Sequence, residues 1–244
     1  MGENSTIVWT HHTFSPWWGC THISEECVHC YAETWAKRWG VLWGKDQPRR
    51  FFPNDHWQEP ERWARRARRL GVRQRVFCGS MCDIAEDRDD LVGHRLRLLD
   101  LITRTADALD WLLLTKLPAN LLRMFPPEVT RLCWVGTTVG TQKAAIERLG
   151  DLERIEARVH FASCEPLLER VYLTPWMPTL QWVIVGGERH ARARPFDLEW
   201  VRVLRNECAL FGVPFLFKQD AGPHPTTLPL LDGQRHDAVP LVAA

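Results

Sequence analysis

The sequence lacks any apolar run that could cross a membrane. Its longest runs, LDWLLLT and WVIVGG, fall far short of the roughly 20 residues that a spanning helix needs. The N-terminal residues also lack the basic and then apolar pattern of a secretory signal peptide. We therefore expect a cytoplasmic protein that does not associate with a membrane, in which cysteines stay reduced.

The sequence also has almost no net charge. Its 31 lysines and arginines balance 30 acidic residues, so the chain as a whole has no general attraction for nucleic acid or membranes. One segment, EPERWARRARRL at residues 59–70, is locally basic. As a helix it places Trp63, Ala67 and Leu70 on one face and five arginines around the rest. Two interpretations stay open: a solvated face whose arginines pair with nearby acids, or a patch that contacts the phosphates of a nucleotide or nucleic acid.

No internal repeat, low-complexity tract or Gly/Ser linker divides the chain. Its 244 residues and 45% hydrophobic content are sufficient for one sizeable core, so we expect a single domain over residues 1–220. Residues 221–244 are rich in proline and have no periodicity, and we expect an irregular C-terminal tail there.

Short apolar segments alternate with helical patterns along the chain. The expected strands lie at about 7–9, 75–81, 110–116, 132–139, 158–166, 181–188 and 213–219. The expected helices follow Cys30 and lie near 59–70, 89–106, 118–124, 141–150 and 197–211. This alternation indicates βαβ units, and therefore an α/β fold with about six or seven mainly parallel strands.

Polar side chains gather where these strands end, which favours a partial (β/α) barrel over a doubly wound sheet. The set comprises Ser80, Asp83, Thr115, Lys116, Thr137, Thr138, Ser163, Glu165, Glu188, Lys218 and Gln219. In a barrel, the loops at the carboxyl ends of the strands converge on one mouth, which carries the chemistry. Charged groups at such positions are rarely buried unless they are paired or used. We therefore expect Lys116, Glu165, Glu188 and Lys218 to form a ring of charge in the mouth.

Three of the eight cysteines, Cys20, Cys27 and Cys30, lie within eleven positions in the segment SPWWGCTHISEECVHCYAE. Clustered thiols in a reducing compartment are more often metal ligands or catalysts than disulfides. Three thiolates suit a 4Fe-4S cluster with one open iron. A closed zinc site needs a fourth ligand, for which His22 or His29 is available. Spacing alone leaves a cluster, a zinc ion and no metal as alternatives.

Other cysteines and tryptophans have simpler interpretations. We expect Cys133, Cys164 and Cys208 in the core, with a nucleophilic Cys164 as the alternative, while Cys78 and Cys82 are weak candidates for a second metal site. Eight of the 13 tryptophans lie in the first 63 residues and are expected to pack around the cysteine segment, although Trp17 or Trp18 could instead stack a base. The GTTVG stretch lacks the glycine spacing of a phosphate-binding loop.

Six regions carry a resemblance to a known family. They are SPWWGCTHISEECVHCYAE, VFCGSMCDIAED, WLLLTK, FASCEPLL, WVIVGGE with ARPFDLEWVRVLR, and GVPFLFKQ. In this order they resemble the phage-associated three-cysteine-motif family, a domain of uncharacterised function found in phages and bacteria. That family is in turn similar to radical S-adenosylmethionine (radical SAM) enzymes, most closely the spore photoproduct lyase group. The resemblance covers the chain to about residue 220.

The resemblance implies a radical-SAM-like barrel in which a 4Fe-4S cluster on the three cysteines binds S-adenosylmethionine and is reduced by an external electron donor. Gly186, Gly187 and Glu188 are similar to the motif that holds the methionine amino group of this cofactor. Tyr31, Ser80 and Asp83 are the other expected cofactor-binding residues, and Lys116, Glu165 and Lys218 the expected catalytic residues.

Several positions depart from these patterns. The first cysteine gap has six residues instead of three, His29 occupies the usual aromatic position with Tyr31 after it, and GGE follows a late strand. Within the three-cysteine-motif family, Arg189, His190 and Arg192 replace small residues after GGE, and Cys82 stands where serine is common.

We therefore expect a radical-SAM-like enzyme acting on a nucleotide or nucleic acid, with a partner protein as a further possibility. The alternatives are a non-catalytic nucleic-acid-associated protein with a structural zinc or cluster, and a cluster enzyme without radical chemistry.

Overall fold

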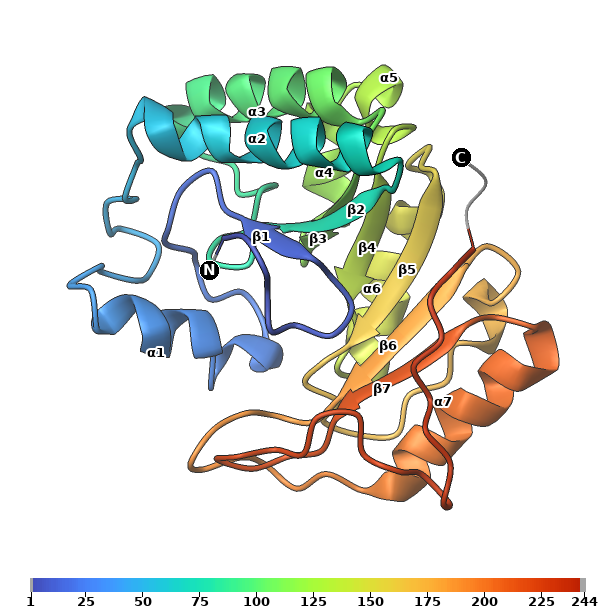
Figure 1. The fold of residues 1–244 in the computed structure, drawn as a ribbon. Helices are drawn as coiled ribbons and strands as arrows, with labels where there is room; N and C mark the ends of the chain where they lie inside the picture. Colours follow the sequence, from blue (N-terminus) through green and yellow to red (C-terminus); the bar gives the residue numbers. More distant parts are fainter. Residues whose placement is uncertain (1, 242–244) are drawn as a thin grey trace. The chain divides into compact units, whose positions relative to one another are not determined.

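The computed structural model describes residues 2–241 of the chain (Figure 1). The strands are β1 (His12–Phe14), β2 (Gln74–Cys78), β3 (Leu109–Thr115), β4 (Trp134–Thr138), β5 (Val159–Cys164), β6 (Trp182–Gly186) and β7 (Phe215–Gln219). The α-helices are α1 (Tyr31–Lys37), α2 (Asn54–Leu70), α3 (Val92–Thr105), α4 (Pro118–Met124), α5 (Pro127–Thr130), α6 (Gln142–Glu153) and α7 (Leu198–Phe211). The short 3-10 helices are η1 (Glu25–Cys27), η2 (Asp89–Leu91) and η3 (Thr174–Trp176). No helix within the described residues is both long and apolar enough to span a membrane.

The strands follow one another in the sheet in chain order, from β1 to β7. The pairs β1–β2, β2–β3, β5–β6 and β6–β7 are all parallel. Parallel neighbours require crossover connections, and helices supply most of them here. The expected α/β class with the topology of a partial (β/α) barrel is therefore confirmed.

Two expectations about local structure are corrected. Residues 7–9 form a turn, in which the amide of Thr10 donates to the carbonyl of Ile7 (3.1 Å), and the first strand lies instead at His12–Phe14. That strand pairs with β2, with Thr13 opposite Phe77. Strand preference depends on such pairing more than on the β-branched residues Ile7 and Val8. Helix α2 also begins earlier than expected, at Asn54.

Residue contacts divide the chain into two compact units. Unit 1 comprises Met1–Ile23, Ala32–Val135 and Ile155–Arg158, and unit 2 comprises Ser24–Tyr31, Gly136–Arg154 and Val159–Ala244. The boundary runs through the strand β4, and Cys20 belongs to unit 1 whereas Cys27 and Cys30 belong to unit 2.

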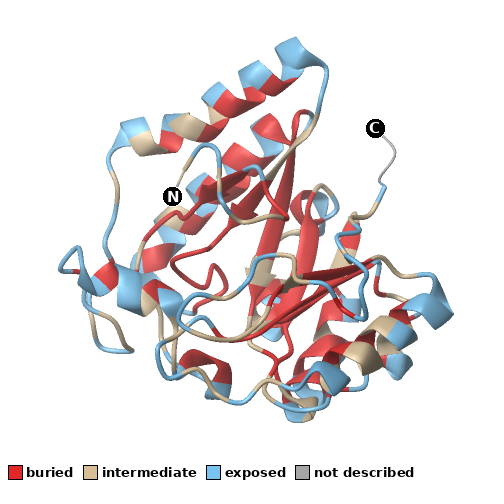
Figure 2. Ribbon diagram, turned by 60° about the horizontal axis from the view of Figure 1, so that its bottom comes forward, coloured by how far each residue is buried: buried red, intermediate tan, exposed pale blue. Residues whose placement is uncertain are grey.

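Unit 1 packs two long helices on the first three strands. Helix α2 lies beside α3 and against β2 and β3 (Figure 1). It buries Trp57, Trp63 and Ala67 on one face, and it ends at Gly71, whose left-handed conformation (φ +66°) suits glycine. Each helix thus buries one side against largely buried strands (Figure 2).

Unit 2 contains the strands β5, β6 and β7. The side chain of Thr141 caps the N-terminus of α6, and that of Asp197 caps α7, which packs on β7. The C-terminal segment of residues 221–240 contains no helix or strand and folds back along β7. The amide of Phe217 donates to the carbonyl of His236 (2.9 Å), and that of Leu228 donates to Lys218 (2.8 Å).

Candidate functional site

The turn that carries Cys27 and Cys30 in unit 2 is anchored by the glutamate that precedes Cys27. The Oε1 atom of Glu26 accepts a hydrogen bond from the amide of Gly140 (3.2 Å), just after β4, and another from the Arg148 guanidinium of α6 (3.0 Å). Glu26 and Arg148 are both buried. Burial raises the pKa of Glu26, but hydrogen bonding from Ser24 and the charge of Arg148 lower it overall. The carboxylate therefore stays ionised and fixes the turn to the carboxyl end of β4.

This anchor requires a glycine at position 140. A Cβ atom there would stand 2.3 Å from the carbonyl oxygen of Pro166 and 2.7 Å from the Cγ atom of Glu26. The second glycine of the GTTVG stretch therefore allows the cysteine turn to approach the strand end.

The same turn is held a second time by the histidine that precedes Cys30. The Nδ1 atom of His29 lies 2.8 Å from Oε2 of Glu188, which follows β6 and is buried. The backbone amide and guanidinium of Arg194 also donate to this carboxylate (2.9 and 2.6 Å). Burial raises the pKa of Glu188, but the hydrogen bonds from Arg194 and His29 outweigh it and lower the pKa to about 2.

These contacts also set the tautomer of His29. Because the ionised carboxylate of Glu188 can only accept, the Nδ1 atom of His29 carries a proton. Its Nε2 atom is then the nitrogen that remains available when the imidazole is neutral. The ring also stacks on His190, with centroids 4.3 Å apart.

The segment around Cys20 in unit 1 is fixed to the turn that follows β2. The amide of Gly19 donates to the carbonyl of Met81 (3.1 Å), and the hydroxyl of Thr21 donates to Glu86 (2.5 Å). Glu86 forms a buried ion pair with Arg49, whose Nη1 atom also donates to the carbonyl of Gly44 (2.9 Å). The Cys20 segment is therefore tied to the carboxyl end of β2.

The cysteine segments offer thiols and imidazoles as possible metal ligands. No group of three or more His, Cys, Asp or Glu side chains among residues 2–241 is arranged to hold a metal ion. Within unit 2, the Sγ atom of Cys27 contacts the Ser24 hydroxyl (3.7 Å), and Cys30 is half-buried. Thiols are the type of ligand that soft metals such as zinc or iron prefer, so metal binding by these cysteines stays a prediction.

The residues expected at the mouth divide between the units. In unit 1, the buried Asp83 accepts from the hydroxyl of Thr115 (2.6 Å) and the amide of Lys116 (2.8 Å), so it links the turn after β2 to the end of β3. The buried Ser80 lies 3.3 Å from the hydroxyl of Ser15.

In unit 2, Glu165, just after β5, forms an ion pair with Lys218 of β7. Tyr31 begins α1 and is 48% exposed. Gly187 lies against the C-terminal segment, because a Cβ atom there would stand 2.6 Å from the amide nitrogen of Ala221. Gly186 is likewise close to Glu165 and Gln219. The packing of the chain thus accounts for both glycines, and their expected contact with a cofactor stays a prediction.

The remaining cysteines are buried in their units. Burial raises the pKa of Cys78, Cys82 and Cys164 well above the ordinary value and that of Cys208 to about 12, so these thiols stay protonated. Trp17 is also fully buried, which leaves no face for a stacked base, whereas Trp18 is partly exposed.

The basic face of α2 is only partly neutralised. Arg66 pairs with Glu3 (2.8 Å) and Arg68 with Asp107 (2.6 Å). The exposed Arg62, Arg65 and Arg69 form one stripe along the helix and make no ion pair with any residue in the described part of the chain. Arg66 and Arg68 therefore fit the interpretation of a solvated face paired with acids, whereas contact of the other three arginines with phosphates stays a prediction.

Several residues of the site were missed from the sequence. Glu26 is not among the residues expected from the sequence, and His29 is expected only as a possible zinc ligand and not as the partner of Glu188. Arg148 does leave a signal, since it interrupts the apolar stripe of Ala144, Ala145, Leu149 and Leu152, and a charge at such a position predicts a buried partner. Arg49 leaves no comparable signal, because its acceptors are loop carbonyls and a distant glutamate.

Comparison with known proteins yields one match. A family model described as "Protein of unknown function (DUF5131)" matches residues 4–240. No curated protein matches the sequence. No solved structure matches it either.

Proposed function

The chain belongs to DUF5131, a family described only as a protein of unknown function, and for this member we propose an iron–sulfur enzyme of the radical-SAM-like type that acts on a nucleotide or nucleic acid. The three thiolates of Cys20, Cys27 and Cys30 would bind a 4Fe-4S cluster.

The observation that carries this proposal is the anchoring of both cysteine segments to carboxyl ends of strands. In unit 2, Glu26 and His29 fix the Cys27–Cys30 turn to the residues after β4 and β6. In unit 1, backbone and side-chain bonds fix the Cys20 segment to the turn after β2. In barrels with parallel strands, that end of the sheet carries the chemistry.

When bound, the cluster with S-adenosylmethionine would supply a hydrogen-abstracting radical for the substrate. The residues of the protein would then position the cofactor and the substrate. Glu165, just after β5, and Lys218 of β7 form an ion pair across the intervening strand β6, and this pair would position the substrate. Asp83 holds the ends of β2 and β3 together, which would orient Lys116.

The first test is anaerobic purification with quantification of iron, sulfide and zinc. We expect about four irons and four sulfides per chain, and an electron paramagnetic resonance signal of the reduced protein that shifts when S-adenosylmethionine is added. Cys27→Ala should lose the iron, whereas Cys208→Ala, which removes a buried thiol of α7, should retain it. A cluster that is indifferent to S-adenosylmethionine would contradict the radical-SAM-like part of the proposal alone.

The arginine stripe of α2 supports nucleic acid as the substrate class. Arg62 and Arg69 are seven positions apart, or about 10 Å along the helix axis, which is sufficient for the stripe to contact more than one phosphate. The loop after Glu188 adds Arg189 and Arg192, both exposed. Replacing the three stripe arginines by glutamine should reduce the slope of log K against log salt by roughly one per lost phosphate contact. Replacing the paired Arg66 and Arg68 should change the slope less, and equal effects of the two sets would contradict a specific role for the stripe.

A second candidate is a nucleic-acid-associated protein in which zinc links the cysteine segments. The orientation of His29 favours it, because metal-binding imidazoles usually donate their other nitrogen to a carboxylate, as His29 does to Glu188. One zinc per chain without iron, lost in His29→Ala, would support this candidate and exclude the cluster.

A further inference from the structure

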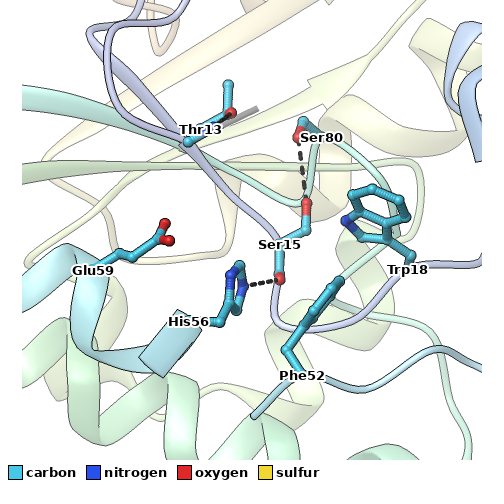
Figure 3. Close-up of a pocket in the computed structure, with 8 residues that line it drawn as sticks. Thr13, Ser15, Trp18, Phe52, His56, Glu59 and Ser80 are labelled. Atoms are coloured by element: carbon cyan, nitrogen blue, oxygen red, sulfur yellow. Dashed lines mark hydrogen bonds between the residues drawn. The ribbon is translucent and has the colours of Figure 1, made fainter. Parts of the chain in front are cut away.

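A small pocket of about 100 Å³ lies in unit 1, between the first two turns of α2 and the carboxyl ends of β1 and β2 (Figure 3). It is lined by Gly2, Thr13, Ser15, Trp18, Phe52, His56, Glu59 and Ser80. Ser80 is an expected cofactor-binding residue and Trp18 a candidate for stacking a base, but the proposed function gives the other six lining residues no role.

The pocket contains one carboxylate, that of Glu59. Glu59 is half-buried, and its side chain makes no hydrogen bond or ion pair with any residue between positions 2 and 241. Two residues further along the helix, Glu61 does pair, with Arg104. A carboxylate that is partly removed from water favours a ligand that brings positive charge.

The histidine beside it provides a second acceptor. The Nε2 atom of His56 lies 3.0 Å from the carbonyl oxygen of Ser15, which can only accept, so Nε2 carries the proton. The ring packs against Phe14 and Phe52, with centroids 4.8 and 4.3 Å away. Burial lowers the pKa of His56, so the imidazole is neutral at pH 7 and its Nδ1 atom accepts hydrogen bonds.

The other walls are hydroxyls and aromatic rings, and no lysine or arginine lines the pocket. The hydroxyl of Ser15 already accepts from the amide of Met81 (3.1 Å). The guanidinium of Arg50 lies over the rings of Trp18 and Phe52, 5.2 and 5.6 Å from their centroids. These two rings therefore already face one cation of the chain.

We propose that this pocket binds the ammonium group of a small primary amine. Glu59 would neutralise the charge, the Nδ1 atom of His56 and a hydroxyl such as that of Thr13 would accept hydrogen bonds, and Trp18 and Phe52 would contact the carbon atoms. An anion is disfavoured, because it would approach Glu59 and none of the side chains that line the pocket is basic.

The volume limits the size of the occupant. An apolar cavity of about 150 Å³ holds one benzene molecule, so a pocket of about 100 Å³ accommodates roughly three or four non-hydrogen atoms. Ethylammonium, with two carbons and one nitrogen, therefore suits the pocket, as does the amino end of a longer molecule that projects outward.

The test is a titration of the full-length protein with ethylammonium, followed by ligand-observed NMR at constant ionic strength. Ethanol and acetate, which are of similar size but neutral and anionic, serve as matched ligands. We expect saturable binding of ethylammonium and at least about tenfold weaker binding of both matched ligands, because a charge-assisted hydrogen bond is lost. Glu59→Gln should weaken ethylammonium binding by about tenfold or more, while Glu61→Gln, on the same helix but paired with Arg104, should leave it within about twofold.

Several results would overturn the proposal. If Glu59→Gln bound ethylammonium as tightly as the unaltered protein, the Glu59 carboxylate would have no role in binding. If ethanol bound as tightly as ethylammonium, the positive charge of the ligand would have no role. Absence of binding by all three ligands would leave a pocket that holds only solvent. If ethylammonium bound only after acetylation of the chain's own amino terminus, the occupant of the pocket would be that amino group and not an external amine. The comparison of ligands uses the unaltered protein, so it decides the question even if a variant folds poorly.

Discussion

At the scale of single residues, the stability of the fold depends on charged side chains that are buried beside the Cys27–Cys30 turn. Glu26 and Arg148 are both buried and paired, and Glu26 also satisfies the amide of Gly140. Removing one member of a buried pair leaves the other charge uncompensated, which costs far more than the loss of an exposed pair.

We therefore predict that Glu26→Gln lowers the free energy of unfolding by about 3–5 kcal/mol. Urea unfolding followed by circular dichroism measures it. The control is Glu147→Gln, which breaks the exposed pair with Lys143 on the same helix and should cost less than about 0.5 kcal/mol. Similar losses in the two variants would show that the buried pair does not stabilise the fold as argued.

Gly187 is a second residue where the close approach of another segment restricts the side chain. A Cβ atom there would stand 2.6 Å from the backbone nitrogen of Ala221, and backbone atoms move less readily than side-chain ends. We predict that Gly187→Ala destabilises the protein by about 1–3 kcal/mol. Gly150→Ala is the matched control, because its Cβ atom meets nothing within 4 Å and lies inside α6. It should instead stabilise by up to about 1 kcal/mol, and a loss at both positions would contradict the packing argument.

The pH dependence of stability follows from Glu188. Its pKa falls from the ordinary value of 4.5 to about 2 on folding, so the folded state binds the proton less readily than the unfolded state. The stabilisation is therefore fully present above about pH 4.5 and disappears as the pH falls towards 2. We predict that the difference in unfolding free energy between the wild type and Glu188→Gln is largest at pH 7 and shrinks across this window. A difference that stays constant down to pH 2 would mean that the carboxylate is not preferentially ionised in the folded state.

At the scale of elements, the sequence predicts what is periodic and misses what depends on partners. The helix at 118–124 and the strand at 110–116 lie within one residue of their expected bounds, since each is a continuous local pattern. The first strand was expected five residues too early, because three residues carry little periodicity and its position is set by pairing with β2.

In the candidate site, too, local patterns are predictable from the sequence and contacts with distant partners are not. The cysteine spacing and the polar strand ends are visible in the sequence, and the structure does bring Glu165 to Lys218 and Asp83 to the amide of Lys116. The anchors Glu26 and His29 are not visible, because their partners lie 114 and 159 residues further along the chain. Contacts of that separation are determined by topology, which local patterns do not encode.

Helix α6 gives a prediction at this scale, because it carries Arg148 towards Glu26. Its N-terminus is capped by Thr141, whose side chain accepts from the amide of Ala144 (3.1 Å). We predict that Thr141→Ala lowers the free energy of unfolding by about 1 kcal/mol. In Thr103→Ala, an exposed threonine inside α3 is replaced by a better helix former, so stability should stay equal or rise. Thermal or urea unfolding measures both variants. A loss of stability in Thr141→Ala alone supports capping, whereas equal losses in both variants would indicate a general effect of removing threonine.

At the scale of the whole molecule, neither unit is a continuous piece of chain. Residues 24–31 belong to unit 2 although unit 1 precedes and follows them in sequence. Within unit 2 they provide Glu26 to Arg148 and His29 to Glu188. The described contacts of unit 1 around Cys20, including the pair of Arg49 with Glu86, do not use them.

Replacing residues 24–31 by a Gly/Ser segment of the same length should therefore destabilise unit 2 more than unit 1. Arg148 would lose its buried partner and Glu188 one of its donors, so amide hydrogen exchange in α6 and β6 should accelerate while that in β2 and α3 changes less. A second version that restores only Glu26 and His29 in the Gly/Ser background should recover most of the protection, because these side chains and not the cysteines hold the turn. Uniform acceleration in both units would show that the chain unfolds as one body, and failure of the restored version would transfer the anchoring role to Cys27 and Cys30.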